Sequence, residues 1–309
     1  MRFRMDFVFK AISVDEKSRI VRFVAEPNPE RYEWQNKDGK RFLYDKFDKI
    51  LFPEEVYFSG FTKIVGQPIY YQPNKIGNAT VYVESRKPLI EKRLDGIENT
   101  PVFEDKSDDF LRSLETNELA FVVMSIDIVN STYLATSIDN KTYVQLISVI
   151  LYELSEVIPK FHGYVLKYTG DGLIAYFPEP SFIVKNDLAI DCALTIHKLI
   201  YEAINPIFEK RNIPTINIRI GLDAGEAYIE TIGSPDTKQH KDIIGGVINL
   251  AVKIQSAAKP GEIYLGNTVE QNLHTAWRQI CEIVEMEEGW NYKDTAGKVY
   301  KVHRVKFLR

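Results

Sequence analysis

An apolar segment that ends in an aspartate constrains this chain most. Leu119–Ile128 is hydrophobic at nearly every position, which is typical of a central strand buried on both faces. Asp127 stands at the carboxyl end of this run, where a carboxylate is costly unless it is paired, hydrogen-bonded or bound to a metal ion. The segment therefore predicts a buried strand that carries an acidic group to a polar site.

The residues that follow alternate between helical and extended patterns. Apolar residues recur at helical spacing in Tyr143–Ile158 and Leu188–Phe208. Two short strand-like runs flank the turn 169–172 and indicate a hairpin. Further strands are expected at 216–222, 225–232 and 262–265, with a helix at 244–257. This order predicts an α+β domain with a mostly antiparallel sheet.

A second acidic residue stands at the tip of the predicted hairpin. Asp171 lies in the sequence Thr169-Gly170-Asp171-Gly172. Each aspartate alone has a structural explanation, since Asp127 can cap the following turn and Asp-Gly is a common turn pair. Two carboxylates on neighbouring elements are also what Mg²⁺ or Mn²⁺ prefers, together with substrate phosphates. The pair therefore predicts a divalent-cation site.

The residues before this domain have a different character. Short aromatic and β-branched runs, separated by turn residues, predict strands at Phe7–Ile12, Arg19–Ala25, Phe61–Val65, Pro68–Gln72 and Ala79–Glu84. Residues 96–117 are polar and acidic, as in a linker that holds one helical turn or more. We therefore expect a β-rich module over 1–95 with a scaffolding or sensory role, a linker over 96–117, and the larger domain over 118–309.

Composition narrows the classes of partner. The chain has 39 basic and 43 acidic residues and a net charge of −4, without the basic footprint of a nucleic-acid binder. No segment approaches the about 20 apolar residues of a membrane-spanning helix, and the N-terminus lacks the apolar core of a secretory signal. Cys192 and Cys281 match no metal or redox spacing. We expect a cytoplasmic protein that binds small molecules or protein surfaces.

Four blocks in order carry a family resemblance across residues 120–269. They read SIDIVNST, KYTGDGLIAYF, RIGLDAGEAYI and DIIGGVINLAVKI. With these blocks the chain resembles the class III adenylate/guanylate cyclase family. The resemblance implies a ferredoxin-like βαββαβ core with added elements. It also implies a head-to-tail homodimer whose active sites lie at the interface and convert a nucleoside triphosphate to a cyclic nucleotide.

The resemblance also implies roles for the two aspartates. Asp127 and Asp171, helped by the backbone carbonyl of Ile128, would hold two divalent cations, Mn²⁺ or Mg²⁺. One ion would lower the pKa of the ribose 3′-hydroxyl for attack on the α-phosphorus, and the other would neutralise charge on the leaving diphosphate. The loop Val129–Thr132 leads into a helix and would offer backbone N–H groups to the phosphates.

Two further positions match the family on the predicted helix 244–257. Asn249 matches the asparagine that positions the ribose. Lys253 stands where the family usually has an arginine that stabilises the transition state. A lysine keeps the positive charge but lacks the bidentate fork of an arginine.

The base pocket has two interpretations. Lys167 and Asp242 fall where adenylate cyclases read adenine, the lysine donating to a ring nitrogen and the aspartate accepting from an amine. This pair favours ATP.

The first metal block favours a pyrimidine instead. Ser125, Asp127, Asn130 and Ser131, followed by Thr132, resemble the S-x-D-x-x-N-S signature of bacterial pyrimidine cyclases of the Pycsar antiphage system. Met124 replaces a tyrosine or arginine of that group, and we expect its side chain to fill space that a purine would need. UTP is therefore favoured, with ATP or CTP as alternatives.

A uridylate cyclase of this kind would imply antiviral defence, with cUMP or cCMP read by a separate effector protein. Two other classes were considered. A silent cyclase fold that only senses nucleotide is opposed by the presence of Asp127, Asp171 and Asn249. A diguanylate-cyclase or polymerase palm would need a second acid in the hairpin, where this chain has Gly172.

Overall fold

The structure is a computed structural model that describes residues 5–15, 20–56, 74–96, 105–178, 184–287 and 289–307. The chain divides into two compact units. The N-terminal unit comprises residues 1–73 and 273–279, and the large unit comprises residues 74–272 and 280–309. None of the described helices combines the length and the apolar character needed to cross a bilayer.

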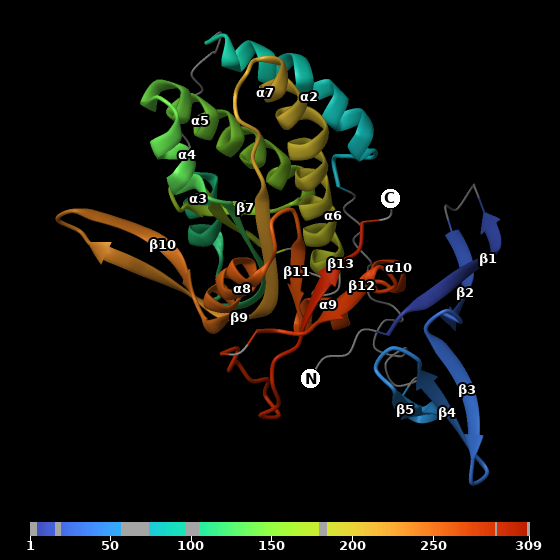
Figure 1. Cartoon of the computed structure of the whole chain (residues 1–309). Coiled ribbons are helices and arrows are strands. Elements are labelled where there is room, and N and C mark those ends of the chain that lie inside the picture. The colour runs from blue at the N-terminus through green and yellow to red at the C-terminus, as the bar shows by residue number, and fades with distance from the viewer. Residues whose placement is uncertain are drawn as a thin grey trace. The chain divides into compact units, whose positions relative to one another are not determined.

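The N-terminal unit is built from short antiparallel strands (Figure 1). β1 (Phe7–Asp15) pairs with β2 (Ile20–Pro27), and β3 (Tyr32–Lys37), β4 (Lys40–Asp45) and β5 (Ile50–Pro53) form a three-stranded sheet. Asp38 and Gly39 both have positive φ, as a tight two-residue hairpin requires. The expected β-rich region ahead of the larger domain is confirmed.

One chain segment returns to this unit from far along the sequence. Helix α10 (Thr275–Arg278) lies in segment 273–279, and Arg278 forms an ion pair with Asp48 at 2.8 Å. The Thr275 backbone N–H donates to the carboxylate of Asp6 at 3.1 Å. The N-terminal unit is therefore joined to the rest of the chain at more than one place in the sequence.

One predicted strand near residue 80 is wrong. Residues 79–84 belong to helix α2 (Ala79–Leu94), which Asn78 caps by accepting from the Val81 N–H. The β-branched residues suggested a strand, but Val83, Ile90 and Leu94 bury one helical face, and tertiary packing overrides a weak local propensity. The strands expected at 61–65 and 68–72 lie outside the described residues.

The large unit contains the expected βαββαβ core. In chain order it runs β6 (Glu118–Ile128), α4 (Ser131–Ser137), α5 (Asn140–Val157), β7 (Tyr164–Tyr168), β8 (Leu173–Phe177), α6 (Val184–Leu199) and β9 (Ile218–Ser234). The sheet order is β7-β8-β6-β9 with antiparallel neighbours, so β6 is central. The α+β, ferredoxin-like assignment is confirmed.

Two helical details were not expected from the sequence. α3 (Lys106–Ser113) lies inside the segment interpreted as a linker. α6 begins at Val184, ahead of the predicted start, and continues through a π-helical turn (Ile200–Ile204) into α7 (Asn205–Lys210). Pro206 follows that turn, and a proline removes a helical hydrogen bond and displaces the preceding carbonyl.

Further elements extend the core on the β9 side. β10 (Lys238–Ile244) pairs with the outer half of β9, and α8 (Gly246–Ala257) leads to β11 (Ile263–Gly266), which is parallel to β9. α9 (Asn267–Asn272), β12 (Cys281–Val284) and β13 (Val302–Val305) complete this side. The two strands expected at 216–222 and 225–232 are one continuous strand, because Ala224 and Gly225 keep their pairing with Val122 and Phe121 of β6 and form no turn.

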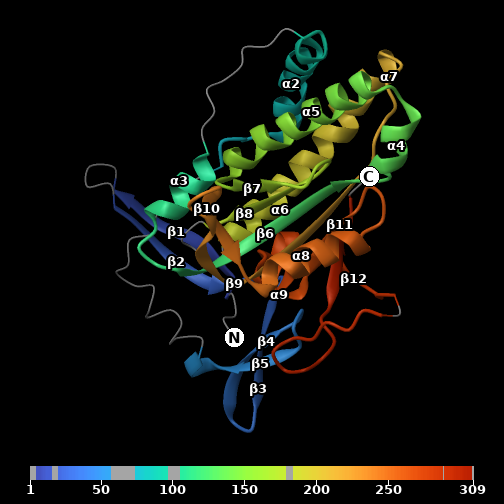
Figure 2. The same cartoon turned by 90° about the vertical axis from the view of Figure 1, so that its left-hand side faces the viewer.

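The two faces of the sheet are covered by different helices (Figures 1 and 2). Phe121 and Val123 of β6 pack with Val247, Ile248 and Ala251 of α8. Successive strand residues point to opposite faces, so the even-numbered residues of β6 face the side of α5 and α6. Asp127 shares the α8 face with Val123.

Candidate active site

Asp127 is held by two donors from neighbouring elements. Arg219 stands opposite it on β9, and its Nη2 donates to Asp127 Oδ2 at 2.6 Å. Gln255 of α8 donates to the same oxygen at 3.4 Å. The side chains of Asp127 and Arg219 are 28% and 27% exposed, so the carboxylate is accessible from solvent.

The hairpin brings Asp171 beside Asp127. β6 pairs with β8 so that Ile126 lies opposite Leu173, two residues beyond Asp171. A Cβ on Gly172 would lie 2.2 Å from the Ile126 carbonyl oxygen and 3.1 Å from Asp127 Cα. Only glycine permits this approach, so the hairpin turn lies directly against the backbone of Asp127. Asp171 itself is partly exposed.

This donor set fits a divalent cation that also binds substrate. Among the described residues, no three His, Cys, Asp or Glu side chains gather as a ligand cluster. Two partly exposed carboxylates and the following Ile128 carbonyl are hard oxygen donors, and Mg²⁺ is commonly held by one or two carboxylates, water and phosphate oxygens. Asp127 and Asp171 therefore suit ions that arrive with a nucleotide.

The loop after β6 differs in part from expectation. Asn130 adopts a left-handed conformation, with φ of 55°, ahead of the first turn of α4. The Val129 N–H donates to the Asn217 carbonyl at 2.8 Å, so it is not available to a phosphate. Ser131 and Thr132 open α4, where the first N–H groups of a helix lack intrahelical partners.

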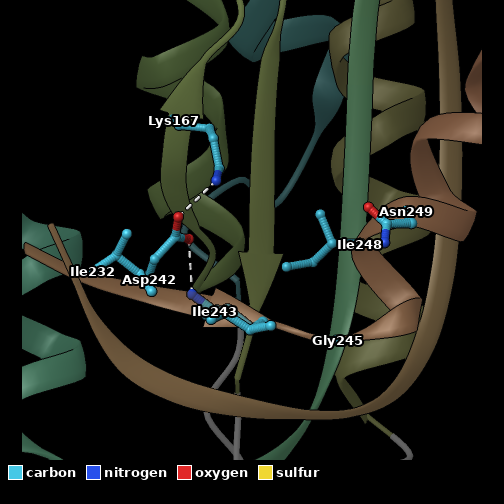
Figure 3. Close-up of a pocket in the computed structure, with 8 residues that line it drawn as sticks. Lys167, Ile232, Asp242, Ile243, Gly245, Ile248 and Asn249 are labelled. Atoms are coloured by element: carbon cyan, nitrogen blue, oxygen red, sulfur yellow. Dashed lines mark hydrogen bonds and ion pairs between the residues drawn. The ribbon is translucent and has the colours of Figure 1, made fainter.

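A second group of predicted residues lines a pocket (Figure 3). Lys167 of β7 and Asp242 of β10 form an ion pair at 2.7 Å. They line a cavity of about 300 Å³ with Asn249 at the start of α8. The remaining lining residues are apolar or glycine: Ile232, Ile243, Ile244, Gly245 and Ile248. The arrangement offers one donor, one acceptor and an apolar wall to a flat polar ring.

Helix α8 connects the pocket to the aspartates. Asn249 and Lys253 are both exposed and, at i and i+4, lie on one face of the helix. Gln255, near the other end, reaches Asp127. A Cβ on Gly221 of β9 would lie 2.2 Å from the Gln255 backbone nitrogen, so this glycine allows α8 to approach the sheet closely.

Met124 is not brought to this site. Its side chain is fully buried, and it does not line the cavity. Strand alternation places it on the face opposite Val123, which contacts Ile248 of α8. The expectation that Met124 fills space in the base pocket is therefore not supported. Ser125 is also buried, on the same strand face as Asp127.

Sequence reasoning missed Arg219 and Gln255. Arg219 opens the block RIGLDAGEAYI, and Gln255 directly follows the block DIIGGVINLAVKI. Their proximity to Asp127 depends on the pairing of β9 with β6 and on the packing of α8. The sequence signal for Arg219 was a charged residue between two isoleucines at the start of a predicted strand.

Comparisons with known proteins agree with this architecture. The family model for the adenylate and guanylate cyclase catalytic domain matches residues 116–298. The adenylyl cyclase CyaB from P. aeruginosa has a similar fold, with a TM-score of 0.54 and 22% identity over 63% of this chain and 98% of that chain. The guanylate cyclase domain of RhGC from Catenaria anguillulae, solved with GTP, has a TM-score of 0.52 and 19% identity over 63% of this chain and all of that chain.

Curated relatives are similar over a shorter part of their length. A cytidylate cyclase from Escherichia coli is 27% identical over 160 residues, which is 49% of this chain and 35% of the relative. Adenylate cyclase type 10 from Oryctolagus cuniculus is 27% identical over 154 residues, which is 47% of this chain and 9% of the relative. The family model covers more than half of the chain, and the chain belongs to the adenylate and guanylate cyclase catalytic domain family.

Proposed function

We propose that this protein converts a nucleoside triphosphate to its 3′,5′-cyclic monophosphate and diphosphate. The observation that carries the proposal is that the hairpin turn holding Asp171 lies against the backbone of Asp127, with a pocket lined by Lys167, Asp242 and Asn249 at the start of α8. Such an arrangement suits a substrate whose triphosphate and base bind at separate places. The names of the similar proteins, which include adenylate and cytidylate cyclases, support the same reaction.

In this proposal the carboxylates of Asp127 and Asp171 hold two divalent cations, Mn²⁺ or Mg²⁺. When bound, these ions would activate the ribose 3′-hydroxyl and neutralise charge on the leaving diphosphate. Arg219 is a fixed cation at the same carboxylate and would meet the phosphates as they arrive. Asn249 would orient the ribose, and Lys253 would stabilise charge at the α-phosphorus in the transition state.

We propose that the working form is a homodimer, because Asn249 and Lys253 present an exposed face of α8. In a head-to-tail dimer that face would complete the site of a second copy. Mixing Asp127→Ala with Asn249→Ala, each inactive alone, tests this arrangement. Half of the dimers would then contain one copy of each variant, and one of the two sites in such a dimer would be intact. About a quarter of the wild-type activity would therefore be restored. No recovery would show that both residues serve a site within one chain.

The pocket geometry favours a base with an exocyclic amine. Asp242, the acceptor, is 14% exposed, whereas Lys167, the donor, is 43% exposed. The deeper acceptor suits an amine that projects from the ring, and the outer donor suits the adjacent ring nitrogen. Cytosine and adenine have an amine beside an acceptor ring nitrogen. Uracil has a carbonyl beside a ring N–H, and the amine of guanine lies beside a ring N–H on its pairing edge.

The preferred substrate is therefore CTP, with ATP second. The Ser125–Ser131 signature and the similarity to cytidylate cyclases favour the pyrimidine. The exclusion of a purine by Met124 loses support, because its side chain is buried outside the pocket. UTP is less favoured than CTP because uracil has a carbonyl where Asp242 would accept from an amine. Similarity to adenylate cyclases and the Lys167–Asp242 pair keep ATP as the alternative.

Incubating the pure protein with Mn²⁺ and each of the four nucleoside triphosphates separates these possibilities. We expect cCMP or cAMP as the main product. Dominant cUMP would contradict the base assignment but leave the cyclase proposal intact. Asp127→Asn and Asp171→Asn should abolish turnover, while Asp236→Asn, in an exposed turn, is the matched control. Full activity of Asp127→Asn would contradict the metal assignment.

We further propose, on the Ser125–Ser131 signature, that the product is a second messenger in antiviral defence. A separate effector protein would bind it. Measuring cyclic nucleotides in cells that express the chain, before and after phage infection, tests this role. An unchanged level of every cyclic nucleotide after infection would contradict it.

A further inference from the structure

Asp223 of β9 is a buried carboxyl group that forms no ion pair with any residue that the structure describes. It is 3% exposed, and its Oδ1 accepts a hydrogen bond from the Tyr300 hydroxyl at 2.6 Å. Burial raises the pKa of Asp223 to about 7, although the Tyr300 hydroxyl and the Ala224 backbone N–H partly oppose this rise. Such a group is costly when charged and needs a structural reason to be present.

The surroundings of Asp223 are shaped to hold this hydrogen bond. A Cβ on Gly266 of β11 would lie 2.1 Å from Asp223 Oδ1 and 2.9 Å from the Tyr300 hydroxyl, so only glycine leaves room. From α9, the Thr268 N–H donates to the Tyr300 oxygen at 3.1 Å, and the Thr268 hydroxyl lies 3.0 Å from it. Among the described groups that contact the carboxyl, which are Tyr300, the Ala224 N–H and Gly266, only Tyr300 is titratable.

Tyr300 belongs to a segment that packs on α8. We call residues 285–301 the C-terminal strap; the structure describes all of them except residue 288. The Trp290 Nε1–H donates to the Tyr300 carbonyl at 2.9 Å, and the Tyr300 N–H donates to the Tyr292 carbonyl at 2.7 Å. These bonds tie Tyr300, near the C-terminal end of the strap, to its middle.

The strap contacts α8 beside its two exposed polar residues. Tyr300 packs in a hydrophobic cluster with Ile254, and Leu250 and Trp290 pack against the same cluster. Leu250 and Ile254 directly follow Asn249 and Lys253 in the helix. A shift of the strap would therefore move the face of α8 that carries those residues.

We propose that Asp223 and Tyr300 are a positioning pair that locks the C-terminal strap against α8, and that the lock loosens when Asp223 is deprotonated. The proposal rests on the proposed roles of Asn249 and Lys253 for its effect on turnover. With Asp223 neutral, the bond to Tyr300 is made without burying a charge. With Asp223 ionised, the Tyr300 hydroxyl still donates to it, but the docked strap must cover a buried anion that no cation among the described residues faces. The cost of this desolvation exceeds the gain from the hydrogen bond.

The sign of the pH effect follows from proton binding. The folded pKa lies above the unfolded value of 3.8, so the folded state holds more protons between these values. Folding stability from this group is therefore full at low pH and is lost as the pH rises toward 7. Above pH 7 the lock is at its weakest.

Hydrogen exchange tests the lock without relying on activity. Exchange of peptides from 246–257 and 285–301, corrected for intrinsic rates, is measured at pH 6 and pH 8. We expect wild-type protection to fall at pH 8, Asp223→Asn to stay protected at both values, and Tyr300→Phe to exchange faster at both. Tyr292→Phe, with a partly exposed ring in the same strap, is the control. The proposal would be overturned if Tyr300→Phe exchanged at the wild-type rate. It would also be overturned if exchange in Asp223→Asn responded to pH as it does in wild type.

Turnover gives the second readout. We expect Tyr300→Phe to lower kcat about tenfold with little change in KM, because Lys253 acts in the transition state. We expect the kcat of the wild-type protein to fall between pH 6 and pH 8, and the kcat of Asp223→Asn to lack this fall. Loss of protection without loss of kcat would overturn the positioning role. A wild-type protein inactive with all four triphosphates would contradict the proposed function, while the exchange result would still decide whether the lock exists.

Discussion

Helix α2 is joined to α5 by one buried ion pair, and removing the cation measures what this contact contributes to the large unit. Arg86 Nε and Nη2 donate to the two carboxylate oxygens of Glu153 at 2.7 and 2.8 Å. Glu153 is fully buried, whereas Arg86 is 12% exposed. The perturbation is Arg86→Ala.

The expected loss follows from which partner is left behind. Arg86→Ala leaves a carboxylate in the core without a cation, which lowers the free energy of unfolding by about 3–5 kcal/mol. Glu153→Gln should cost less, about 1–3 kcal/mol, because Arg86 keeps some solvent and lies 3.9 Å from Glu156.

Urea unfolding at pH 7, followed by circular dichroism at 222 nm, measures these differences. Lys87→Ala is the matched control on the same helix, because its pair with Glu84 is 34% and 57% exposed and is worth under about 1 kcal/mol. Arg86→Lys keeps the charge but loses the bidentate geometry. Its decrease in the free energy of unfolding should therefore lie between that of Lys87→Ala and that of Arg86→Ala.

Equal stability of Arg86→Ala and Lys87→Ala would refute the reasoning. It would mean that α2 detaches at little cost and that the buried pair makes no net contribution. A loss confined to Arg86→Ala and Glu153→Gln would instead show that α2 is a structural part of the large unit, although it precedes the segment matched by the family model.

Three other perturbations test the site and its support. Arg219→Ala removes the cation that competes with a metal ion for Asp127. A partly exposed ion pair is worth about 1 kcal/mol, so the affinity for Mn²⁺ without nucleotide, measured by electron paramagnetic resonance, should rise about fivefold. A weaker affinity in the variant would count against this competition. Gly221→Ala forces a Cβ within 2.2 Å of the α8 backbone and should lower unfolding free energy by about 1–3 kcal/mol, whereas Gly246→Ala, with open space, should be nearly neutral in the same urea titration. Burial lowers the pKa of His197 to about 4, so the unfolded state binds more protons than the folded state between pH 4 and 6.5, and the free energy of unfolding falls as the pH drops through that window. Urea unfolding at pH 7 and pH 5 should therefore show a smaller loss of stability for His197→Gln than for wild type. An equal loss in the two proteins would refute this assignment.

Local patterns were sufficient where the chemistry is local. The apolar run of β6, the Gly-Asp-Gly turn and the periodicity of α5 each depend on neighbouring residues, and the structure confirms the core that they build. The strand expected at 79–84 was wrong because β-branched residues carry only a weak preference, which packing of one helical face overrides. The break expected near Gly225 was wrong because that glycine stays paired with Phe121 of β6 within a long strand, and strand pairing depends on residues distant in sequence.

The Met124 result shows where sequence reasoning stopped. Met124 and Asp127 are three residues apart on one strand, so alternation alone places their side chains on opposite faces. The sequence did not show which face carries α8 and the pocket, because that depends on how the chain crosses the sheet. A size argument built on Met124 therefore lacked the fact that decides it.

The sequence by itself determined the family blocks, the central strand with Asp127, and the hairpin that presents Asp171. Only the tertiary structure decided what surrounds those carboxylates: Arg219 from the paired strand β9 and Gln255 from α8. It also decided that Asp223 meets Tyr300, which is 77 residues away. The physical reason is the same in each case, since burial and hydrogen bonding between distant residues are set by strand register and helix packing.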